Sequence, residues 1–385
     1  MYCWILFIGY LFQPGMSKKV KAIDGVEDQY VSRGFCILIF SVPLILIACR
    51  TGFGDTGSYL GYFKSMPIFF YDFARSVRSH EDCRLFWGIM TLIKIIINDH
   101  PQLLLAGLAC FQAFAVEHVI RRYSPDLGLS MFIFLCSALL GNWMCNGIRQ
   151  FTAVCILFMF TQWLVDKKWY CYLPLVLIVM GANPILKRFG METDLWLLGG
   201  IHESAIIMLP IMFCLPGKPF NIRVFAATFI ILTLIFTGLF EDVMSGAVEN
   251  TSYTRDLENA AADTGTNIIR VLVAMVPSIL SLLKWQYFKV NKIPPFISMC
   301  VNASFITAAV YLASSFTSGI YVGRLPIYTE IYNLILLPWL IKHAYRENEK
   351  LMRILLIAGY TGFFAYQYLV QWDGLYKSSI LGIGV

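Results

Sequence analysis

Charged side chains are scarce in this chain, at 14% of its 385 residues, whereas soluble proteins carry about 25%. Apolar residues make up 58% and stand in long continuous runs. These proportions exclude a soluble enzyme, a secreted disulfide domain and a disordered protein. The runs also lack the alternation of a membrane β-barrel. The net charge of +6 does not indicate nucleic acid as a partner, because Lys and Arg mostly set loop orientation in a polytopic membrane protein.

Cysteine spacing of the metal-binding kind is also missing. The eleven cysteines lie almost all inside apolar runs, with no CxxC pair or Cys/His pattern, so we interpret them as small buried hydrophobic residues. The chain shows no internal repeat and no soluble domain. Its amino end lacks a basic stretch and a small-residue cleavage site, so we do not expect a cleaved signal peptide. We predict one integral membrane domain over residues 1–385.

Long apolar runs are what the chain has in place of polar segments. A transmembrane helix needs about 20 mostly apolar residues, and twelve runs are candidates. We therefore predict an all-α polytopic membrane protein with about twelve transmembrane helices, with eleven to thirteen as the range. The runs are 1–13, 34–49, 101–120, 127–145, 149–165, 169–185, 195–214, 222–240, 268–288, 296–316, 325–342 and 353–371.

One further apolar run, 85–97, is short and contains Lys94. Runs of about thirteen residues more often lie along a membrane surface than cross it. If this run does not cross, 17 of the 30 basic residues fall on short inner loops, as the positive-inside rule requires. We therefore predict a short interfacial helix there, in the first large outer loop, and place both termini on the extracytoplasmic side. The 17 are Lys18, Lys19, Lys21, Arg33, Arg121, Arg122, Lys167, Lys168, Lys218, Arg223, Lys284, Lys289, Lys292, Lys342, Arg346, Lys350 and Arg353.

Two outer loops are long under this topology, 50–100 and 241–267. The first is rich in aromatic residues, among them Tyr59, which fit interfacial packing or the stacking of sugar rings. The second contains six acidic residues. It is either a solvated acidic loop or a lid over a site. The six are Glu241, Asp242, Glu249, Asp256, Glu258 and Asp263.

Four arginines lie at the outer ends of predicted helices, where arginine is normally rare. They are Arg50, Arg149, Arg270 and Arg324. Each one alone could be an arginine that reaches for the interface or forms a helix-end ion pair. Together with His202 they share one side and one depth. Because a guanidinium presents a planar fork that suits phosphate, the set predicts a phosphate- or pyrophosphate-bearing ligand at the outer surface.

Two residues among them could move a proton. Asp55 stands in a glycine-rich loop and is a candidate general base, although it is equally an ordinary turn residue. His202 could be a base, a donor to phosphate or a satisfied interior histidine. Ser204 could bond back to a helix carbonyl. Tyr328 follows Arg324 by four residues and so shares its helix face.

These motifs together resemble the EpsG-type family of bacterial exopolysaccharide polymerases, which is similar to the Wzy polymerases. The resemblance covers about residues 34–342. It rests on Arg50 with Gly54-Asp55-Thr56 and Tyr59, on Asn146-Gly-Ile-Arg149-Gln150 with Ala153, on His202-x-Ser204-Ala205 before Leu209-Pro210, and on Arg324-Leu-x-x-Tyr328 before Leu336-Leu-Pro338.

The resemblance implies a polymerase of undecaprenyl-pyrophosphate-linked repeat units in exopolysaccharide, capsule or O-antigen synthesis. It would act at the outer face of the bacterial cytoplasmic membrane, in contact with membrane lipid. Its protein partners would include a chain-length regulator and a flippase. No cofactor is implied, although acidic loop residues could supply ligands for a divalent metal. Asp55 or His202 would take the acceptor proton. Pyrophosphate contacts would come from Arg50, Arg149, Gln150, Arg270, Arg324 and Tyr328, and a sugar contact from Tyr59.

Other functions stay open at this point. A lipid-linked oligosaccharide flippase or transporter would favour internal repeats and charges spread through the membrane depth, whereas these charges crowd at the outer end. A membrane glycosyltransferase that uses a polyprenyl-phosphate sugar shares the same outer chemistry. A sugar O-acyltransferase would need its reactive histidine near the cytoplasm, which this topology disfavours.

Overall fold

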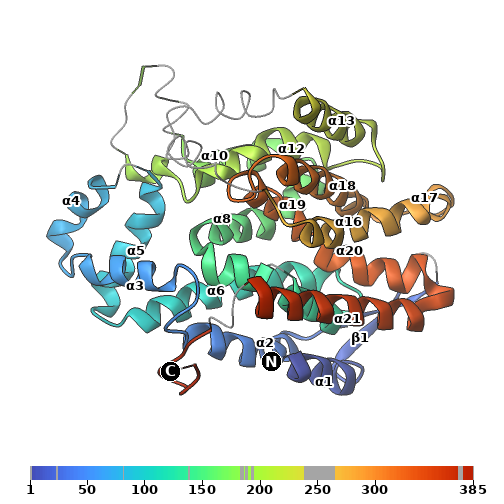
Figure 1. Ribbon diagram of the computed structural model, residues 1–385, viewed down its shortest axis with the longest axis horizontal. Coiled ribbons are helices and arrows are strands. Elements are labelled where there is room, and N and C mark those ends of the chain that lie inside the picture. Colours follow the sequence, from blue (N-terminus) through green and yellow to red (C-terminus); the bar gives the residue numbers. More distant parts are fainter. Residues whose placement is uncertain are drawn as a thin grey trace.

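The structure is a computed structural model that describes residues 2–22, 25–80, 82–137, 139–182, 186, 190–191, 195–237, 265–371 and 376–384. Helices dominate these residues (Figure 1). The first half contains α1 (Tyr2–Phe12), α2 (Arg33–Ala48), α3 (Thr56–Ser65), η1 (Phe70–Asp72), α4 (Phe73–Arg78), α5 (Arg84–Ile97), α6 (Pro101–Tyr123), α7 (Leu127–Cys136), η2 (Leu139–Asn146), α8 (Ile148–Met159), α9 (Thr161–Val165) and α10 (Trp169–Met180).

The second half continues in the same way, with more short helices of non-α type, which are labelled η. It contains η3 (Trp196–Gly199), η4 (Glu203–Ile207), α12 (Met208–Cys214), α13 (Ile222–Phe236), α16 (Ile268–Leu283), α17 (Trp285–Val290), α18 (Pro295–Phe316), η5 (Val322–Arg324), α19 (Ile327–Glu330), α20 (Asn333–Trp339), η6 (Leu340–Ala344), η7 (Arg346–Asn348), α21 (Glu349–Tyr366) and η8 (Gln367–Gln371).

One short hairpin interrupts the helical pattern. Strands β1 (Ser17–Lys21) and β2 (Glu27–Val31) pair antiparallel, with Ser17 opposite Val31. The buried Asp28 of β2 accepts a hydrogen bond from Nε2 of His343 at 2.9 Å, which fixes the hairpin to η6. The sequence did not reveal this hairpin, but the predicted helical class is confirmed for the rest of the described chain.

Local sequence explains where several helices begin. The Ser32 side chain accepts from the Phe35 amide at the start of α2, and Asp126 caps α7 in the same way. Asn267 caps α16. Such caps satisfy amide groups that have no partner in the first helical turn. Helix α6 instead begins with Pro101, whose fixed φ suits the first helical position.

Two helices of the described chain are long and apolar enough to cross a membrane, α6 and α18. A third candidate arises if α7 and η2, bent by 69° to each other, form one span. The predicted number of twelve spans is therefore not confirmed. Several predicted runs are divided into shorter helices: 149–165 becomes α8 and α9, and 325–342 becomes α19, α20 and η6.

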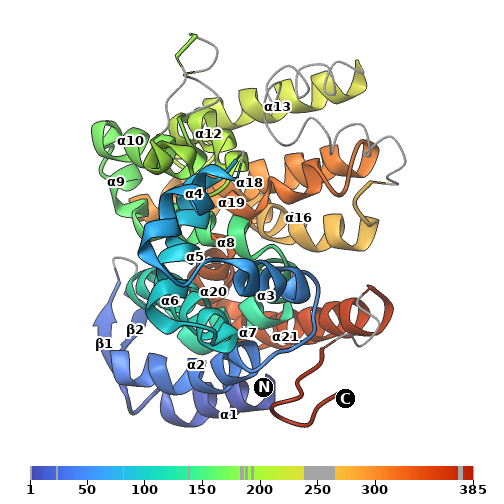
Figure 2. The same cartoon turned by 90° about the vertical axis from the view of Figure 1, so that its left-hand side faces the viewer.

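Helix α18 forms the centre of one half of the molecule. It packs against α16, α13, α19 and α20 and is buried along almost its whole length. In the other half α6 packs against α2 and α8, and α1 against α7. The run 85–97 forms a helix of its own, α5, and its position along the membrane surface stays a prediction. Together with α3 and α4, helix α5 covers one end of the bundle, in front of α8 and α19 in Figure 2.

Candidate functional site

A network of buried polar side chains lies at the end of the bundle that α3 and α5 cover. Its centre is the Ser204 hydroxyl in η4, which lies 2.8 Å from His202 Nδ1 and 3.0 Å from the Tyr328 hydroxyl of α19. Gln150 of α8 donates through Nε2 to the same oxygen at 3.0 Å. Four side chains from three separate segments therefore meet at one hydroxyl.

The donors and acceptors of this network can be assigned. The Ser204 backbone amide also donates to His202 Nδ1, at 3.3 Å, so Nδ1 must be an acceptor. The Ser204 hydroxyl then donates to Nδ1 and accepts from Gln150 and Tyr328, which uses its single donor and both lone pairs. Neutral His202 consequently carries its proton on Nε2. In this tautomer Nε2 is a hydrogen-bond donor and not a proton acceptor.

Gln150 also connects the network to the turn that carries Arg324. Its Nε2 donates to the backbone carbonyl of Arg324 in η5 at 3.0 Å. The Arg324 side chain itself is exposed, so the backbone is fixed while the guanidinium is presented to solvent. Tyr328 lies one turn later and is buried. The sequence placed both on one helix face, but a change of helix type between η5 and α19 separates their environments.

The loop that carries Asp55 is held by Asn146 at the end of η2. The Asp55 amide donates to Asn146 Oδ1 at 2.8 Å. Gly54 has φ of +48°, a conformation that other residues rarely adopt. A Cβ atom on Gly54 would overlap the Asn146 side chain. The glycine is therefore required both for the backbone conformation and for the close approach of this loop to η2.

Two arginine charges act on Asp55, and the raised pKa of its carboxylate makes it a stronger proton acceptor. Partial burial raises the pKa of Asp55 above its ordinary value, although the nearby guanidinium groups of Arg324 and Arg149 act in the opposite direction. The same two arginines act on His202. A carboxylate, an imidazole and two cations from different elements therefore share one electrostatic environment.

Arg149 lies beside the aromatic residues of the covering helices. Its guanidinium lies over the Trp87 ring of α5, 5.8 Å from the ring centre, which is within the range of a cation–π contact. Tyr59 of α3 is affected by the charges of both Arg149 and Asp55, and burial raises its pKa. Its ring packs edge-on against Phe86 with centroids 6.2 Å apart. The aromatic residues of α3 and α5 thus pack on the arginine side of the network.

Arg50 is placed differently from the prediction that groups it with pyrophosphate contacts. It is 2% exposed, and its Nε donates to Thr56 Oγ1 at 3.0 Å while Nη1 donates to the Ile47 carbonyl at 2.7 Å. These contacts join the end of α2 to the start of α3. The Arg50 side chain therefore holds the two ends of the loop that carries Asp55.

Arg270 belongs to a second polar cluster. Its Nη2 donates to the Tyr311 hydroxyl at 2.9 Å, and that hydroxyl donates to Glu330 Oε2 at 2.6 Å. The guanidinium also lies over the Trp143 ring at 5.7 Å. These contacts join α16, α18 and α19 in the interior. Arg270 shares the predicted depth of the other arginines but has different partners.

The structure thus brings together most of the residues that the sequence singled out. Those that meet are Asp55, Tyr59, Arg149, Gln150, His202, Arg324 and Tyr328. The sequence pattern did not indicate the roles of Ser204, Asn146 and Trp87. The first two stand inside the motifs already quoted, and that position was the available signal. Trp87 carried no signal.

The described residues test neither the metal ion that the sequence left open nor the proposed lid. Within the described residues, no group of three or more His, Cys, Asp or Glu side chains is placed to hold a metal ion. Most of the acidic segment 241–267, including all six acidic residues, lies outside the described residues. Its role as a lid therefore stays a prediction.

The fold and the site define a helical membrane protein with a cationic, acid- and histidine-containing site at one end of its bundle. The chain belongs to the EpsG family, whose model matches residues 34–378, nearly the whole length. EpsG is a family of Wzy-like polysaccharide polymerases, so the predicted family and its general role in polysaccharide polymerisation are confirmed. Comparison with curated proteins and with solved structures gives no match.

Proposed function

We propose that this protein polymerises oligosaccharide repeat units linked to undecaprenyl pyrophosphate, at the outer face of the cytoplasmic membrane. The observation that carries the proposal is the meeting of Asp55, His202, Arg149 and Arg324 in one electrostatic environment. A transfer between two lipid-linked sugars needs a proton acceptor and cations for a pyrophosphate leaving group. Both kinds of group are present, and they come from four different segments.

The proposed reaction transfers the growing glycan to a sugar hydroxyl of the next unit. The bond between the anomeric carbon and the pyrophosphate oxygen breaks, and a new bond forms between that carbon and the acceptor oxygen. Asp55 takes the acceptor proton. The electron pair of the broken bond leaves with undecaprenyl pyrophosphate, whose growing negative charge Arg149 and Arg324 stabilise. No metal ion takes part in this scheme.

His202 has a separate role in this scheme. Because its Nδ1 accepts from Ser204, the neutral ring presents an Nε2–H donor, which suits a phosphate oxygen. This assignment supports Asp55 rather than His202 as the base. Tyr59 and the neighbouring aromatic side chains of α3 and α5 would contact sugar rings, which offer apolar faces to aromatic side chains.

The decisive experiment incubates the purified protein with lipid-linked repeat units and separates the products by size. A ladder of products is expected, and Arg149→Ala should reduce it at least a hundredfold, as expected for the loss of a preorganised charge. Arg346→Ala is the matched control, because Arg346 is exposed on η7 and contacts none of the site residues. It should leave the ladder unchanged.

Other outcomes of this experiment would support other functions. A single added unit would indicate an ordinary membrane glycosyltransferase. No product, together with movement of the lipid-linked unit across vesicle bilayers, would indicate a flippase. A ladder that is equally strong in Arg149→Ala would contradict the role of Arg149 as a pyrophosphate contact while leaving polymerisation in place.

A further inference from the structure

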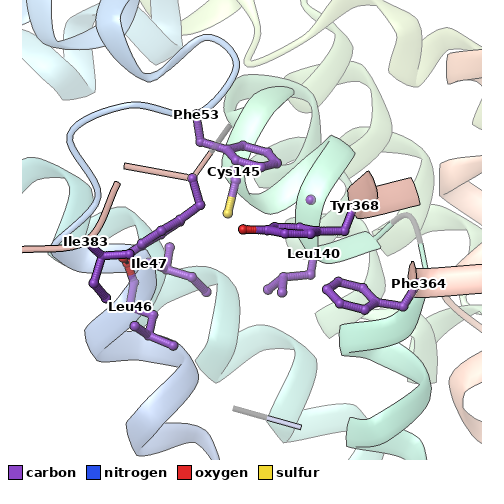
Figure 3. Close-up of a pocket in the computed structure, with 10 residues that line it drawn as sticks. Leu46, Ile47, Phe53, Leu140, Cys145, Phe364, Tyr368 and Ile383 are labelled. Atoms are coloured by element: carbon purple, nitrogen blue, oxygen red, sulfur yellow. Dashed lines mark hydrogen bonds between the residues drawn. The ribbon is translucent and has the colours of Figure 1, made fainter. Parts of the chain in front are cut away.

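A cavity of about 330 Å³ lies between the end of α2, η2, the end of α21 and the carboxyl-terminal segment. Its lining is almost entirely apolar and contains no charged side chain (Figure 3). It is lined by Leu46, Ile47, Phe53, Leu140, Gly141, Cys145, Phe364, Tyr368, Tyr376 and Ile383. None of the catalytic or binding residues assigned above contributes to it.

The cavity adjoins the candidate site through the loop after α2 and the end of η2. Phe53 precedes Gly54-Asp55 in the chain, and Cys145 precedes Asn146. Asp55 and Asn146 are joined by the 2.8 Å hydrogen bond that holds the loop. The apolar cavity therefore begins directly behind the loop on which the proposed base stands. In Figure 3 Phe53 and Cys145 point toward the same space as Tyr368 and Leu140.

One wall of the cavity is the carboxyl-terminal segment, which is fixed to α2. The Tyr376 hydroxyl donates to the Leu46 carbonyl at 2.7 Å, and Ser378 Oγ donates to the Cys49 carbonyl at 2.6 Å. Lys377 pairs with Gly52 through backbone hydrogen bonds of 2.8 and 3.1 Å. The cavity is thus a built feature with a hydrogen-bonded wall, and it is partly open to the outside.

A cation and an exposed apolar surface both lie close to the cavity. Arg50 lies close enough to act electrostatically on Cys145 and Tyr376, two of the lining residues. On η8, next to Tyr368, Leu369 and Val370 are 71% and 66% exposed. A ligand of this cavity would therefore have an apolar chain that can continue over an apolar surface, and a negative charge at the end that faces the site.

We propose that this cavity binds the first isoprene units of the lipid carrier, next to the pyrophosphate. This inference rests on the proposed function, since it assigns a place to part of the same substrate. The size agrees, because an apolar cavity of about 150 Å³ takes up one benzene ring. A cavity about twice as large has room for roughly ten carbon atoms, which is two isoprene units. The rest of the carrier would lie on the exposed apolar surface in the bilayer.

Binding can be tested without polymerisation. Geranyl pyrophosphate, which has two isoprene units and no sugar, is made with a photoreactive group at its far end and added to the purified full-length protein. Crosslinks are expected on Leu46, Phe364 or Tyr368, and unlabelled geranyl pyrophosphate should prevent them. Crosslinks elsewhere would overturn the inference. Prevention by added phosphatidylglycerol but not by geranyl pyrophosphate would show a phospholipid chain in the cavity, which would also overturn it.

The matched variants are Leu46→Trp and Ile45→Trp. Leu46 lines the cavity, whereas its neighbour Ile45 on the same helix is 54% exposed. Filling the cavity should raise KM for the lipid-linked donor about tenfold with little change in kcat, while Ile45→Trp should leave both constants unchanged. Equal constants in the two variants would contradict the inference.

Failure of the inference and failure of the proposed function give different results. If the wild-type protein forms a ladder but the crosslinks map outside the cavity, polymerisation stands and the chain-binding site is wrong. If the wild-type protein forms no ladder, the proposed function is wrong, and the crosslinks still decide whether the cavity takes an isoprenoid chain. Because the crosslinking uses the wild-type protein, it decides the question even if Leu46→Trp does not fold.

Discussion

Ser204 uses its whole hydrogen-bonding capacity inside the candidate site, with one donor and two acceptor positions occupied. Its partners come from segments that are 54 and 124 residues away in the chain. Sequence alone favoured a local bond back to a helix carbonyl, which is the common arrangement for a helical serine. The correct role depends on contacts between distant segments, which a single sequence does not encode in its local pattern.

Replacement of Ser204 by alanine should disrupt the site more than loss of the tyrosine hydroxyl. Ser204→Ala removes three buried hydrogen bonds at once, those with His202, Gln150 and Tyr328, and each is worth about 0.5–1.5 kcal/mol. Tyr328→Phe removes only the last of these and leaves an unused lone pair on Ser204. The unfolding temperature and the amount of polymer formed should both fall further for Ser204→Ala than for Tyr328→Phe. A larger loss in Tyr328→Phe would show that the tyrosine hydroxyl acts on the substrate directly.

Asp55 should determine how the rate depends on low pH. A general base must be ionised, and burial raises the pKa of Asp55 above its ordinary value. The rate should therefore fall as pH decreases through this raised pKa. Asp55→Asn should lower kcat at least a hundredfold and abolish this acidic decline. The measurement is the pH profile of kcat/KM.

A matched control for this experiment is Asp166→Asn. Asp166 lies after α9, where a hydrogen bond from Gln162 and contact with Lys168 lower its pKa. Its replacement should leave both the rate and the acidic decline in place. If Asp55→Asn retains the wild-type pH profile at a reduced rate, Asp55 acts as a positioning residue and another group accepts the proton.

At the scale of elements, the site depends on a contact between the loop after α2 and the last residue of η2, Asn146. Gly54→Ala would force a methyl group against Asn146 and strain a backbone with φ of +48°. The Asp55 amide would lose its bond to Asn146. We expect at least a tenfold loss of kcat with a smaller effect on thermal stability, because the loop lies at one end of the bundle and outside its core.

Gly57→Ala is the control for this loop. Gly57 lies in the first turn of α3, and a Cβ atom there meets nothing within 4 Å. Alanine is also the better helix former. This variant should match the wild-type rate. A similar loss of kcat in both variants would mean that the loop tolerates no change of any kind, and the specific role of the Gly54–Asn146 contact would be wrong.

Elements that are continuous and strongly apolar were predicted well from the sequence. The runs 85–97 and 101–120 correspond to α5, Arg84–Ile97, and α6, Pro101–Tyr123. The run 127–145 was predicted as one helix, but α7 ends at Cys136 and a π-helical turn follows. An apolar run shows which residues avoid water. It does not show where neighbouring segments force a helix to break.

The position of Arg270 shows the same limit at the scale of the whole molecule. Residues at one depth in a membrane can lie on any side of a helical bundle, and hydropathy reports depth alone. Arg149 and Arg324 act on the same groups, whereas Arg270 is joined to Tyr311 and Glu330. Packing of α16 against α18 decides this, and no local motif predicts it.

The orientation of the whole molecule stays a prediction, and labelling of single cysteines tests it. Ser58 is exposed on α3 beside the site, and Lys289 is exposed on α17, far from it in the chain. Because Lys289 belongs to the basic residues assigned to inner loops, Ser58→Cys should react with an impermeant maleimide in intact cells and Lys289→Cys only after permeabilisation. Cys110, which is exposed, is replaced by alanine in both proteins to lower the background. The reverse pattern would place the site in the cytoplasm, where a polymerase of outer-face lipid-linked units could not work.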